Sequence, residues 1–423
     1  MDSYLIVAIG VFIVTYVLIM TEKFNRTAVA MVGAFLMVIL NIEGQEDALR
    51  YIDFNTIGLL IGMMIIVNIM KKSGIFQYVA IKAAKLSKGD PWKIVLYFCT
   101  ITAFSSAFLD NVTTVLLIVP VTLVITDTLE LNPIPFLVPE ILIANIGGTA
   151  TLIGDPPNIM IGSATGLGFM DFVTALSPVV VVIFFITMFA FKYGYRMHYR
   201  ASEENKRKIS KMDEKLAIKD PILMKKSIVV LLFTILGFVL HQALGYESAT
   251  IALFAGSVLL LISKVDVEDI FLEIEWATIF FFIALFMLVG ALEQVGVMEY
   301  LAMKLLDFTG GNMMLTMVVV LWFSAIISSF LDNIPFVATM IPLIKNFGEM
   351  SGSDVTPLWW ALALGACLGG NGTLIGASAN VIVTGLLARH GQKLSFGYYF
   401  KIGFPLMIVS IAISTVYLVI FII

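Results

Sequence analysis

The sequence repeats itself at a constant offset of 222 residues (332 − 110 = 222), which constrains its fold more than any other feature. Phe-Leu-Asp-Asn at 108–111 recurs at 330–333. Apolar segments resemble one another by chance, but polar and glycine landmarks at one offset do not, so the chain is predicted to hold two copies of one unit. Further landmarks at this offset are Asp53 and Glu275, Gly74 and Gly296, Lys82 and Lys304, Pro120 and Pro342, Gly147-Gly148 and Gly369-Gly370, and Gly154 and Gly376.

The amino-acid composition indicates which environment surrounds this unit. Hydrophobic residues make up 60% of the 423 and charged residues 13%, with a mean hydropathy of +0.99. A water-soluble domain cannot bury that much apolar surface, so lipid is the expected surrounding. The net charge of −4 gives no sign of a nucleic-acid partner. Cys99 and Cys367 lie far apart in apolar runs, so neither a disulfide nor a zinc site is expected.

A helix needs about 20 apolar residues to cross a bilayer, and eight runs approach that length. The first is interpreted as a retained span rather than a signal peptide, because its Met-Asp-Ser leader carries no positive charge. The predicted spans are 4–20, 27–41, 54–70, 173–194, 227–243, 248–263, 276–292 and 402–423.

Four other apolar segments are interrupted. Residues 92–127 and 314–346 are broken by Asp-Asn and are predicted to be re-entrant hairpins, whereas 136–165 and 358–388 are broken by glycines. Unpaired backbone survives at membrane depth only beside protein or a water-filled cavity. Equivalent interruptions in two halves are the best sequence sign of a transporter's binding site.

The predicted units are a first repeat, 1–194, and a second, 227–423, joined by a linker at 195–226 with ten Lys and Arg against five Asp and Glu. Each repeat has five crossings if its hairpin re-enters on its own side, so the second copy is expected to be inverted. Residues 71–91 are basic, their counterparts 293–313 are acidic, and basic loops favour the cytoplasm. We therefore expect an all-α polytopic protein of two inverted five-span repeats in the inner (plasma) membrane, with a cytoplasmic linker and both termini outside.

An aspartate followed by an asparagine stands at each predicted hairpin tip. A carboxylate at bilayer depth is costly unless it is paired, hydrated or protonated. The tips are therefore predicted to bind Na⁺ or H⁺, with the asparagines sharing the ion or contacting the substrate. The alternative is that each aspartate only caps the following helix. The candidate residues are Asp110, Asn111, Thr113, Thr114, Asp332 and Asn333.

Threonine and asparagine are interleaved with the glycines of the two broken helices. An unwound helix frees carbonyls for a cation and N–H groups for an anion, and threonine hydroxyls can add ligands. The alternative is that the glycines allow close helix packing. The candidate residues are Gly147, Gly148, Thr149, Thr151, Gly369, Gly370, Asn371 and Thr373.

Asn158 and Asn380 follow the two breaks at equivalent positions and are also candidate ligands, whereas Asp155 corresponds to Ala377. Two interpretations of Asp155 stay open: it tunes coupling, or it only ends the broken segment. Glu140 lies in an apolar run and needs a partner lysine or a water path.

Cys367 precedes the second glycine pair by two residues. A packed residue is favoured there over a ligand for a soft metalloid. His198, His241 and His390 lie at the ends of predicted helices or in loops and are expected at the surface.

The run Gly-Gly-Thr-Ala-Thr-Leu-Ile-Gly-Asp-Pro-Pro-Asn at 147–158 resembles the ion transporter superfamily, and the likeness covers almost the whole chain. That superfamily contains the divalent anion/sodium symporters, the arsenite/antimonite efflux permeases (ArsB), sodium/proton antiporters and the P-protein. Its dicarboxylate branch has serine where Asp110 and Asp332 stand here. The chain instead resembles the arsenite permease and P-protein-like branch, through Phe-Leu-Asp-Asn-Val-Thr-Thr at 108–114.

By this resemblance, the hairpins and broken helices form a transport part that moves against a scaffold part as an elevator. The resemblance also implies a homodimer. No Walker motif is present, but an associated soluble ATPase subunit stays open as a partner. No cofactor is expected beyond Na⁺ or H⁺ as coupling ion.

The leading hypothesis is a secondary active transporter that extrudes arsenite or antimonite, coupled to H⁺ or Na⁺. Two aspartates near one site fit a cation, or a neutral hydroxide such as As(OH)₃, better than a dianion. The alternatives are a Na⁺/H⁺ antiporter, a coupled small-anion transporter and a passive channel. No enzymatic activity is expected, because the sequence offers no nucleophile–base pair or metal cluster.

Overall fold

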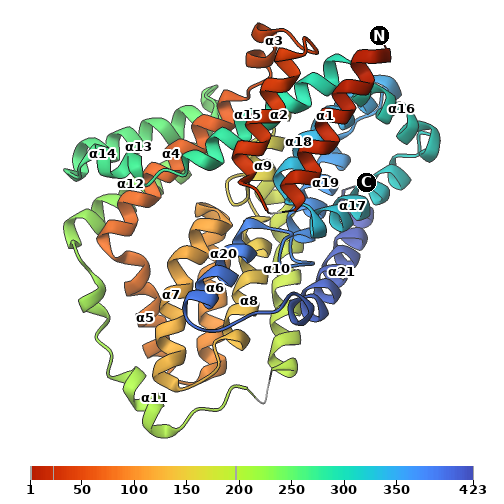
Figure 1. Ribbon diagram of the computed structural model, residues 1–423. Helices are drawn as coiled ribbons and strands as arrows, with labels where there is room; N and C mark the ends of the chain where they lie inside the picture. The colour runs from red at the N-terminus through yellow and green to blue at the C-terminus, as the bar shows by residue number, and fades with distance from the viewer. Residues whose placement is uncertain (1, 22, 196–197, 423) are drawn as a thin grey trace.

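The computed structural model describes residues 2–21, 23–195 and 198–422, which form helices and no strand. Figure 1 shows their arrangement. The helices of the first half are α1 (Asp2–Met20), α2 (Arg26–Ile39), α3 (Gln45–Arg50), α4 (Phe54–Ser73), α5 (Ile75–Leu86), α6 (Pro91–Leu109), α7 (Asn111–Leu129), α8 (Ile134–Gly148), α9 (Pro156–Thr165) and α10 (Phe169–Gly194). Those of the second half are α12 (Pro221–Leu244), α13 (Ser248–Ser263), α14 (Val267–Leu272), α15 (Trp276–Gln294), α16 (Val297–Thr309), α17 (Met313–Phe330), α18 (Asn333–Ser351), α19 (Thr356–Gly369), α20 (Ser378–Arg389) and α21 (Phe396–Phe421).

The order of the helices is the same in both halves, as the duplication predicts. Helices α2 and α13, α4 and α15, α7 and α18, and α9 and α20 begin 222 residues apart. Gly74 and Gly296 precede α5 and α16 with φ of +84° and +82°, a left-handed conformation that glycine adopts without steric cost. The inverted orientation of the second copy stays a prediction.

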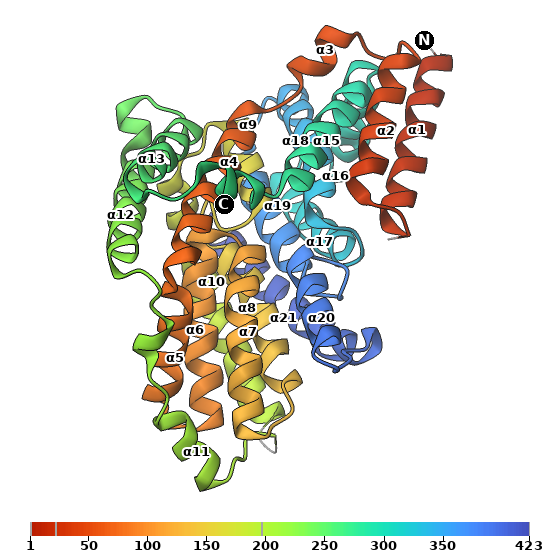
Figure 2. The same ribbon diagram turned by 60° about the vertical axis from the view of Figure 1, so that its left-hand side comes forward.

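The two halves interlock rather than lie apart. Helix α2 packs on α15, and its equivalent α13 packs on α4, as Figure 2 shows from the side. Equivalent bonds join these pairs: the Thr27 hydroxyl donates to the Ala277 carbonyl at 2.8 Å, and the Ala249 N–H donates to Asn55 Oδ1 at 3.1 Å. Each half therefore completes the other's packing.

Eight helices of the described residues are long and apolar enough to cross a membrane, and five shorter ones are also apolar. Their outer faces carry large exposed side chains, among them Phe185, Phe233 and Phe254. Such a surface requires a lipid environment.

The predicted interruptions fall where the helices end. The first hairpin is α6–α7 and turns at Asp110, and the second is α17–α18 and turns at Asp332. The broken helices are α8–α9 and α19–α20, which are interrupted at 149–155 and 370–377.

The charged connection between the halves contains short helices, α11 (Glu203–Ser210) and the 3-10 helix η1 (Glu214–Ala217). Helix α12 starts at Pro221, so the last six residues of the predicted linker, 221–226, belong to this helix. The connection runs along α5 and α7, at the bottom of Figure 1.

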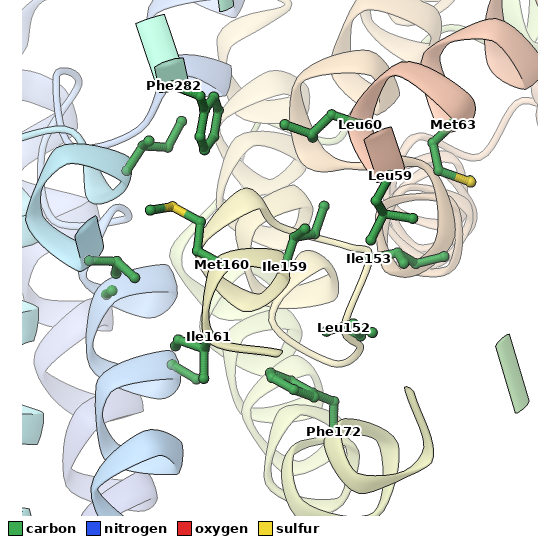
Figure 3. Close-up of a cluster of buried hydrophobic side chains, with 14 of the residues drawn as sticks. Leu59, Leu60, Met63, Leu152, Ile153, Ile159, Met160, Ile161, Phe172 and Phe282 are labelled. Atoms are coloured by element: carbon green, nitrogen blue, oxygen red, sulfur yellow. The ribbon is translucent and has the colours of Figure 1, made fainter. Parts of the chain in front are cut away.

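Apolar side chains hold α9 in place at the middle of the molecule. Figure 3 shows Ile159 of α9 beside Leu59 and Leu60 of α4, with Leu152 and Ile153 of the first break next to them. All five are buried. This packing fixes the start of α9, where Asp155 is the N-cap residue.

Candidate ion and substrate site

The first hairpin tip is organised by Asp110. Its Oδ1 accepts from the Thr113 N–H at 2.8 Å, its Oδ2 from the Thr113 hydroxyl at 2.7 Å, and its carbonyl from the Thr114 hydroxyl at 2.7 Å. Asp110 therefore caps α7, and both threonine hydroxyls donate to it. Its φ of +79° with ψ of 157° is a conformation that costs free energy for any residue but glycine.

The second tip has a different set of partners. Asp332 Oδ2 accepts from Arg26 Nη1 at 2.7 Å and from the Ser378 hydroxyl at 2.8 Å, while its Oδ1 caps α18 through the Ile334 N–H. The Arg26 guanidinium lies 5.1 Å from the centre of the Phe281 ring. The two equivalent aspartates thus differ in charge environment, since one bonds within its own turn and the other holds a guanidinium.

Arg26 was not among the residues that the sequence motifs indicated. It lies on α2 and reaches Asp332 across 306 residues of sequence. The one available signal was its asymmetry, because Ser248 occupies the equivalent position.

Buried asparagines join the two halves at the centre. Asn111 Nδ2 donates to Asn145 Oδ1 at 3.0 Å, and Asn145 Nδ2 donates to Asn371 Oδ1 at 2.9 Å and to Asn380 Oδ1 at 3.0 Å. All four are buried. Asn145 was not among the candidate residues, which in this segment began at Gly147.

A second buried contact crosses the halves beside this network. Asn333 Nδ2 donates to both carboxylate oxygens of Asp155, at 3.2 and 3.4 Å. Asp155 also lies within electrostatic reach of both Asp110 and Asp332. Asp155 therefore contacts the second hairpin tip as well as ending the first break, and its predicted role in coupling stays a prediction.

The two breaks are closed by equivalent asparagines. Asn158 Nδ2 donates to the carbonyls of Thr149 and Thr151, and Asn380 Nδ2 donates to those of Gly370 and Thr373. The freed carbonyls, which were predicted to coordinate a cation, therefore accept from side-chain amides.

The predicted threonine ligands also bond to the main chain. The hydroxyls of Thr149, Thr151 and Thr373 donate to the carbonyls of Asn145, Ala107 and Ser329. Thr149 thus bonds to the end of α8, whereas Thr151 and Thr373 connect the breaks to the hairpin helices α6 and α17.

The glycines of the breaks allow close packing, as the alternative interpretation stated. A Cβ on Gly147 would meet the main chain of Ala103, and one on Gly369 would meet that of the equivalent Ala325. A Cβ on Gly148 would lie 2.5 Å from the Gly154 carbonyl. Helix α8 can therefore approach α6, and α19 approach α17, only with glycine there.

A small cavity of about 70 Å³ lies where the tips meet the rest of the molecule. Of the predicted residues, Asp110, Asn111, Asp155 and Asn333 line it, together with Arg26, Leu60, Met64, Val112, Pro156, Glu275, Thr278, Ile334, Ser378 and Ile382. Helices α2, α4 and α15 form one wall, and the tips with the starts of α9 and α20 form the other. Three carboxylates and one guanidinium thus surround one cavity.

Glu275 is a further cavity residue that sequence analysis used only as a landmark of the repeat. It is the N-cap residue of α15 and lies within electrostatic reach of Asp110. Its carboxylate accepts from the Thr278 hydroxyl at 3.1 Å.

No group of three or more His, Cys, Asp or Glu side chains is placed to hold a metal ion in the described part of the chain. Three of the predicted Na⁺ ligands, Asp110, Asn111 and Asn333, line the cavity, whereas Asp332 pairs with Arg26 and is not part of the lining. Na⁺ binding at these residues stays a prediction.

Other buried polar residues do not line the cavity, although Cys367 lies next to Asp155, which does. Cys367 is buried and contacts Asn158 Oδ1 at 3.6 Å, as expected for a packed residue. Glu140 accepts from the Thr122 hydroxyl at 2.8 Å, and its second oxygen has no hydrogen-bond partner in the described residues. The expectation of a surface position is wrong for His241, which is 8% exposed because it packs under the start of α10 and accepts from the Phe169 N–H.

Two interlocked sets of apolar helices around a charged central cavity define a multi-pass membrane transport protein. The chain belongs to the citrate transporter family (CitMHS), whose family model matches residues 16–365. This is the placement in the ion transporter superfamily that the sequence motifs indicated.

Several relatives match along the whole chain. A 46 kDa membrane protein of Mycobacterium leprae is 41% identical over 421 residues, covering 98% of each chain. An uncharacterised transporter of Mycobacterium tuberculosis is 41% identical over 420 residues, covering 98% of this chain and 97% of that protein. The human P protein is 34% identical over 504 residues and 99% of this chain, which spans 60% of that protein's length.

Solved structures share the fold at low identity. The YdaH transporter of Alcanivorax borkumensis aligns with a TM-score of 0.58 at 13% identity, covering 99% of this chain and 98% of that one. MtrF of Neisseria gonorrhoeae, described as an antimetabolite efflux pump, aligns with a TM-score of 0.63 at 13% identity, covering 92% and 84%.

Proposed function

We propose that this chain is a secondary active transporter that extrudes arsenite or antimonite, with H⁺ or Na⁺ as the coupling ion. The observation that carries the proposal is the size and charge of the central cavity. Its volume is about 70 Å³, and on this measure one water molecule needs about 10–15 Å³. A solute of a few heavy atoms suits this space.

Charge favours the same class of solute. Three carboxylates and one guanidinium line the cavity, so a citrate trianion would meet repulsion as well as too little room. A neutral trihydroxide such as As(OH)₃ can donate its three O–H groups to carboxylate and amide oxygens. We therefore do not propose citrate, the substrate in the family's name, as the substrate of this chain.

Coupling follows from the same groups. Binding of H⁺ or Na⁺ at Asp110 or Asp332 changes the net charge of a cavity that lies between two sets of helices. A ligand that binds one arrangement of these sets better than the other shifts the population toward it. In the elevator mechanism that the superfamily resemblance implies, the hairpins and broken helices move against α2, α4 and α15.

The test is metalloid flux in proteoliposomes with an imposed pH or Na⁺ gradient. Asp110→Asn and Asp332→Asn should each lower coupled arsenite or antimonite flux about 100-fold, since each removes a titratable charge whose loss is worth a few kcal/mol. Asp127→Asn is the matched control, because Asp127 lies on α7 beside exposed His390, and it should keep the parental rate. Full flux in both tip variants, or none in the parent, would contradict the proposal.

A Na⁺/H⁺ antiporter is the second candidate, favoured by the oxygen-rich lining of so small a cavity. A pH-sensitive dye in the same vesicles separates the two functions. Na⁺-dependent dequenching without metalloid flux supports the antiporter, whereas metalloid-dependent flux supports efflux. A saturable rate in either case excludes a passive channel.

We also place the chain in the inner (plasma) membrane with both termini outside and the charged connection in the cytoplasm. The positive-inside distribution supports this orientation. Reporter fusions at the C-terminus and after Lys211 should report opposite sides. A homodimer follows only from the superfamily resemblance, and a soluble ATPase subunit stays an open partner; mass measurement of the purified complex tests both.

A further inference from the structure

A second, larger pocket adjoins the central cavity. Its volume is about 360 Å³, and Arg26, Ser378 and Ile382 line both spaces. It reaches the surface, because Met20 and Phe24 in its wall are 48% and 59% exposed. The large pocket is therefore open to the outside of the protein and lies next to the cavity, and it is called the entrance below.

Arg26 lies at the boundary between the two spaces. Its Nη1 atom donates to Asp332 Oδ2 at 2.7 Å and to the Ser378 hydroxyl at 2.8 Å, and that hydroxyl donates to the same carboxylate oxygen. Asp332 belongs to the second hairpin tip, Ser378 to α20 and Arg26 to α2. Three polar groups from three elements thus close the passage.

The other half has no equivalent closure. The positions equivalent to Arg26 and Ser378 are Ser248 and Pro156. Ser248 carries a hydroxyl but no cation, and Pro156 carries neither. A pocket of about 250 Å³ lies at the equivalent place beside Ser248. Asp110 does not line this pocket, and in the described residues it forms no salt bridge, so the first tip has no protein cation beside it.

We propose that Arg26 is the gate residue of one entrance and the fixed counter-cation of the second half-site. Its guanidinium stands where a free cation would bind Asp332, so this tip accepts a coupling ion only when the pair breaks and the passage opens. The half-site around Asp110 has no such competitor. Binding of a coupling ion at Asp332 and opening of this entrance then happen together. This inference rests on the proposed transport function.

The test measures access rather than transport. Thr278 lines the central cavity and not the large pocket, so Thr278→Cys reports entry of a membrane-impermeant methanethiosulfonate reagent. Native Cys99 and Cys367 are buried, and the parent without the reporter gives the background. Reagent is applied to each face of the membrane in turn.

Arg26→Gln should speed labelling of the reporter about tenfold or more from one face only, as expected when a gate equilibrium shifts by that factor. From the predicted topology this is the cytoplasmic face. Arg26→Lys keeps a cation for Asp332 but loses the contact with the Phe281 ring, so its labelling rate should lie between those of the parent and Arg26→Gln. Lys23→Gln removes a neighbouring exposed charge and should change nothing.

The double variant Arg26→Gln/Asp332→Asn removes both charges and avoids an unpaired carboxylate. It should melt near the parental temperature and label as fast as Arg26→Gln. Parental labelling rates from both faces in a folded double variant would overturn the gate. Fast labelling in a protein that moves no metalloid would keep the gate and refute only the proposed substrate.

Discussion

Asn158 and Asn380 carry out the same task in the two halves, since each amide donates to two carbonyls that a broken helix leaves free. A buried carbonyl without a donor is costly, so a break at the centre of a membrane protein needs such a residue. Asn145 has no equivalent, because Cys367 occupies its position. It is instead the single residue that connects Asn111 of one half to Asn371 and Asn380.

Asn145→Ala should therefore destabilise the protein strongly. The substitution leaves three buried amide groups without a partner, at about 1–3 kcal/mol for each group that stays unpaired. The melting temperature in detergent measures the loss. Asn346→Ala is the control, since Asn346 only bonds to a carbonyl of its own helix, and an equal loss in both variants would contradict a special role for Asn145.

At the scale of elements, two equivalent helix pairs approach one another through glycine. Helix α8 packs on α6 at Gly147, and α19 packs on α17 at Gly369. Ser106 and Ser328, again 222 residues apart, each donate to a carbonyl of the partner helix at 2.6 Å. Each hairpin is thus bonded to its broken helix, and the two form one packed group.

Gly147→Ala and Gly369→Ala should each cost about 1–3 kcal/mol, as for other overpacked sites. The added methyl group would force α8 from α6, or α19 from α17. Gly10→Ala in α1 is the matched control, because nothing lies within 4 Å of its Cβ position, and it should be neutral or slightly stabilising. Thermal unfolding in detergent tests this, and equal melting temperatures in all three variants would refute the packing argument.

Across the whole molecule, the charged connection is docked rather than free. Lys85 Nζ of α5 lies 2.8 Å from Glu214 Oε2 of η1. The hydrogen bond to Glu214 raises the pKa of Lys85 above its ordinary 10.5, and the bond from Lys85 lowers the pKa of Glu214 below 4.5. Both partners are charged between the lowered pKa of Glu214 and the raised pKa of Lys85. The ion pair is lost as pH falls through the first pKa or rises through the second.

Lys85→Ala should loosen the connection without unfolding the helices. Hydrogen exchange of residues 203–217 should become about two- to fivefold faster at neutral pH, the scale expected for one exposed ion pair. The same acceleration should appear in the parent below the lowered pKa of Glu214. Lys93→Ala, an exposed charge on α6, should leave exchange unchanged, and no difference between the two variants would contradict docking through this pair.

The sequence alone was enough to predict the apolar helices, the turns at Asp110 and Asp332 and the two glycine breaks, but not α5 and α16, which lie in stretches treated as charged loops. These follow from local chemistry: apolar length, proline, glycine and capping residues act within a few positions of one another. The duplication extended that reasoning, because it identified equivalent positions without any structure. It also led to Asp110, Asn111, Asp155 and Asn333, all of which line the cavity.

Only the tertiary structure decided how these residues are partnered. Arg26 meets Asp332 across 306 residues, and Asn145 meets Asn380 across 235; no local pattern encodes either contact. The duplication even concealed them, since it treats Asp110 and Asp332 as equals. Charge and hydrogen bonding act through space between interlocked halves, so a single unmatched arginine makes two equivalent carboxylates physically different.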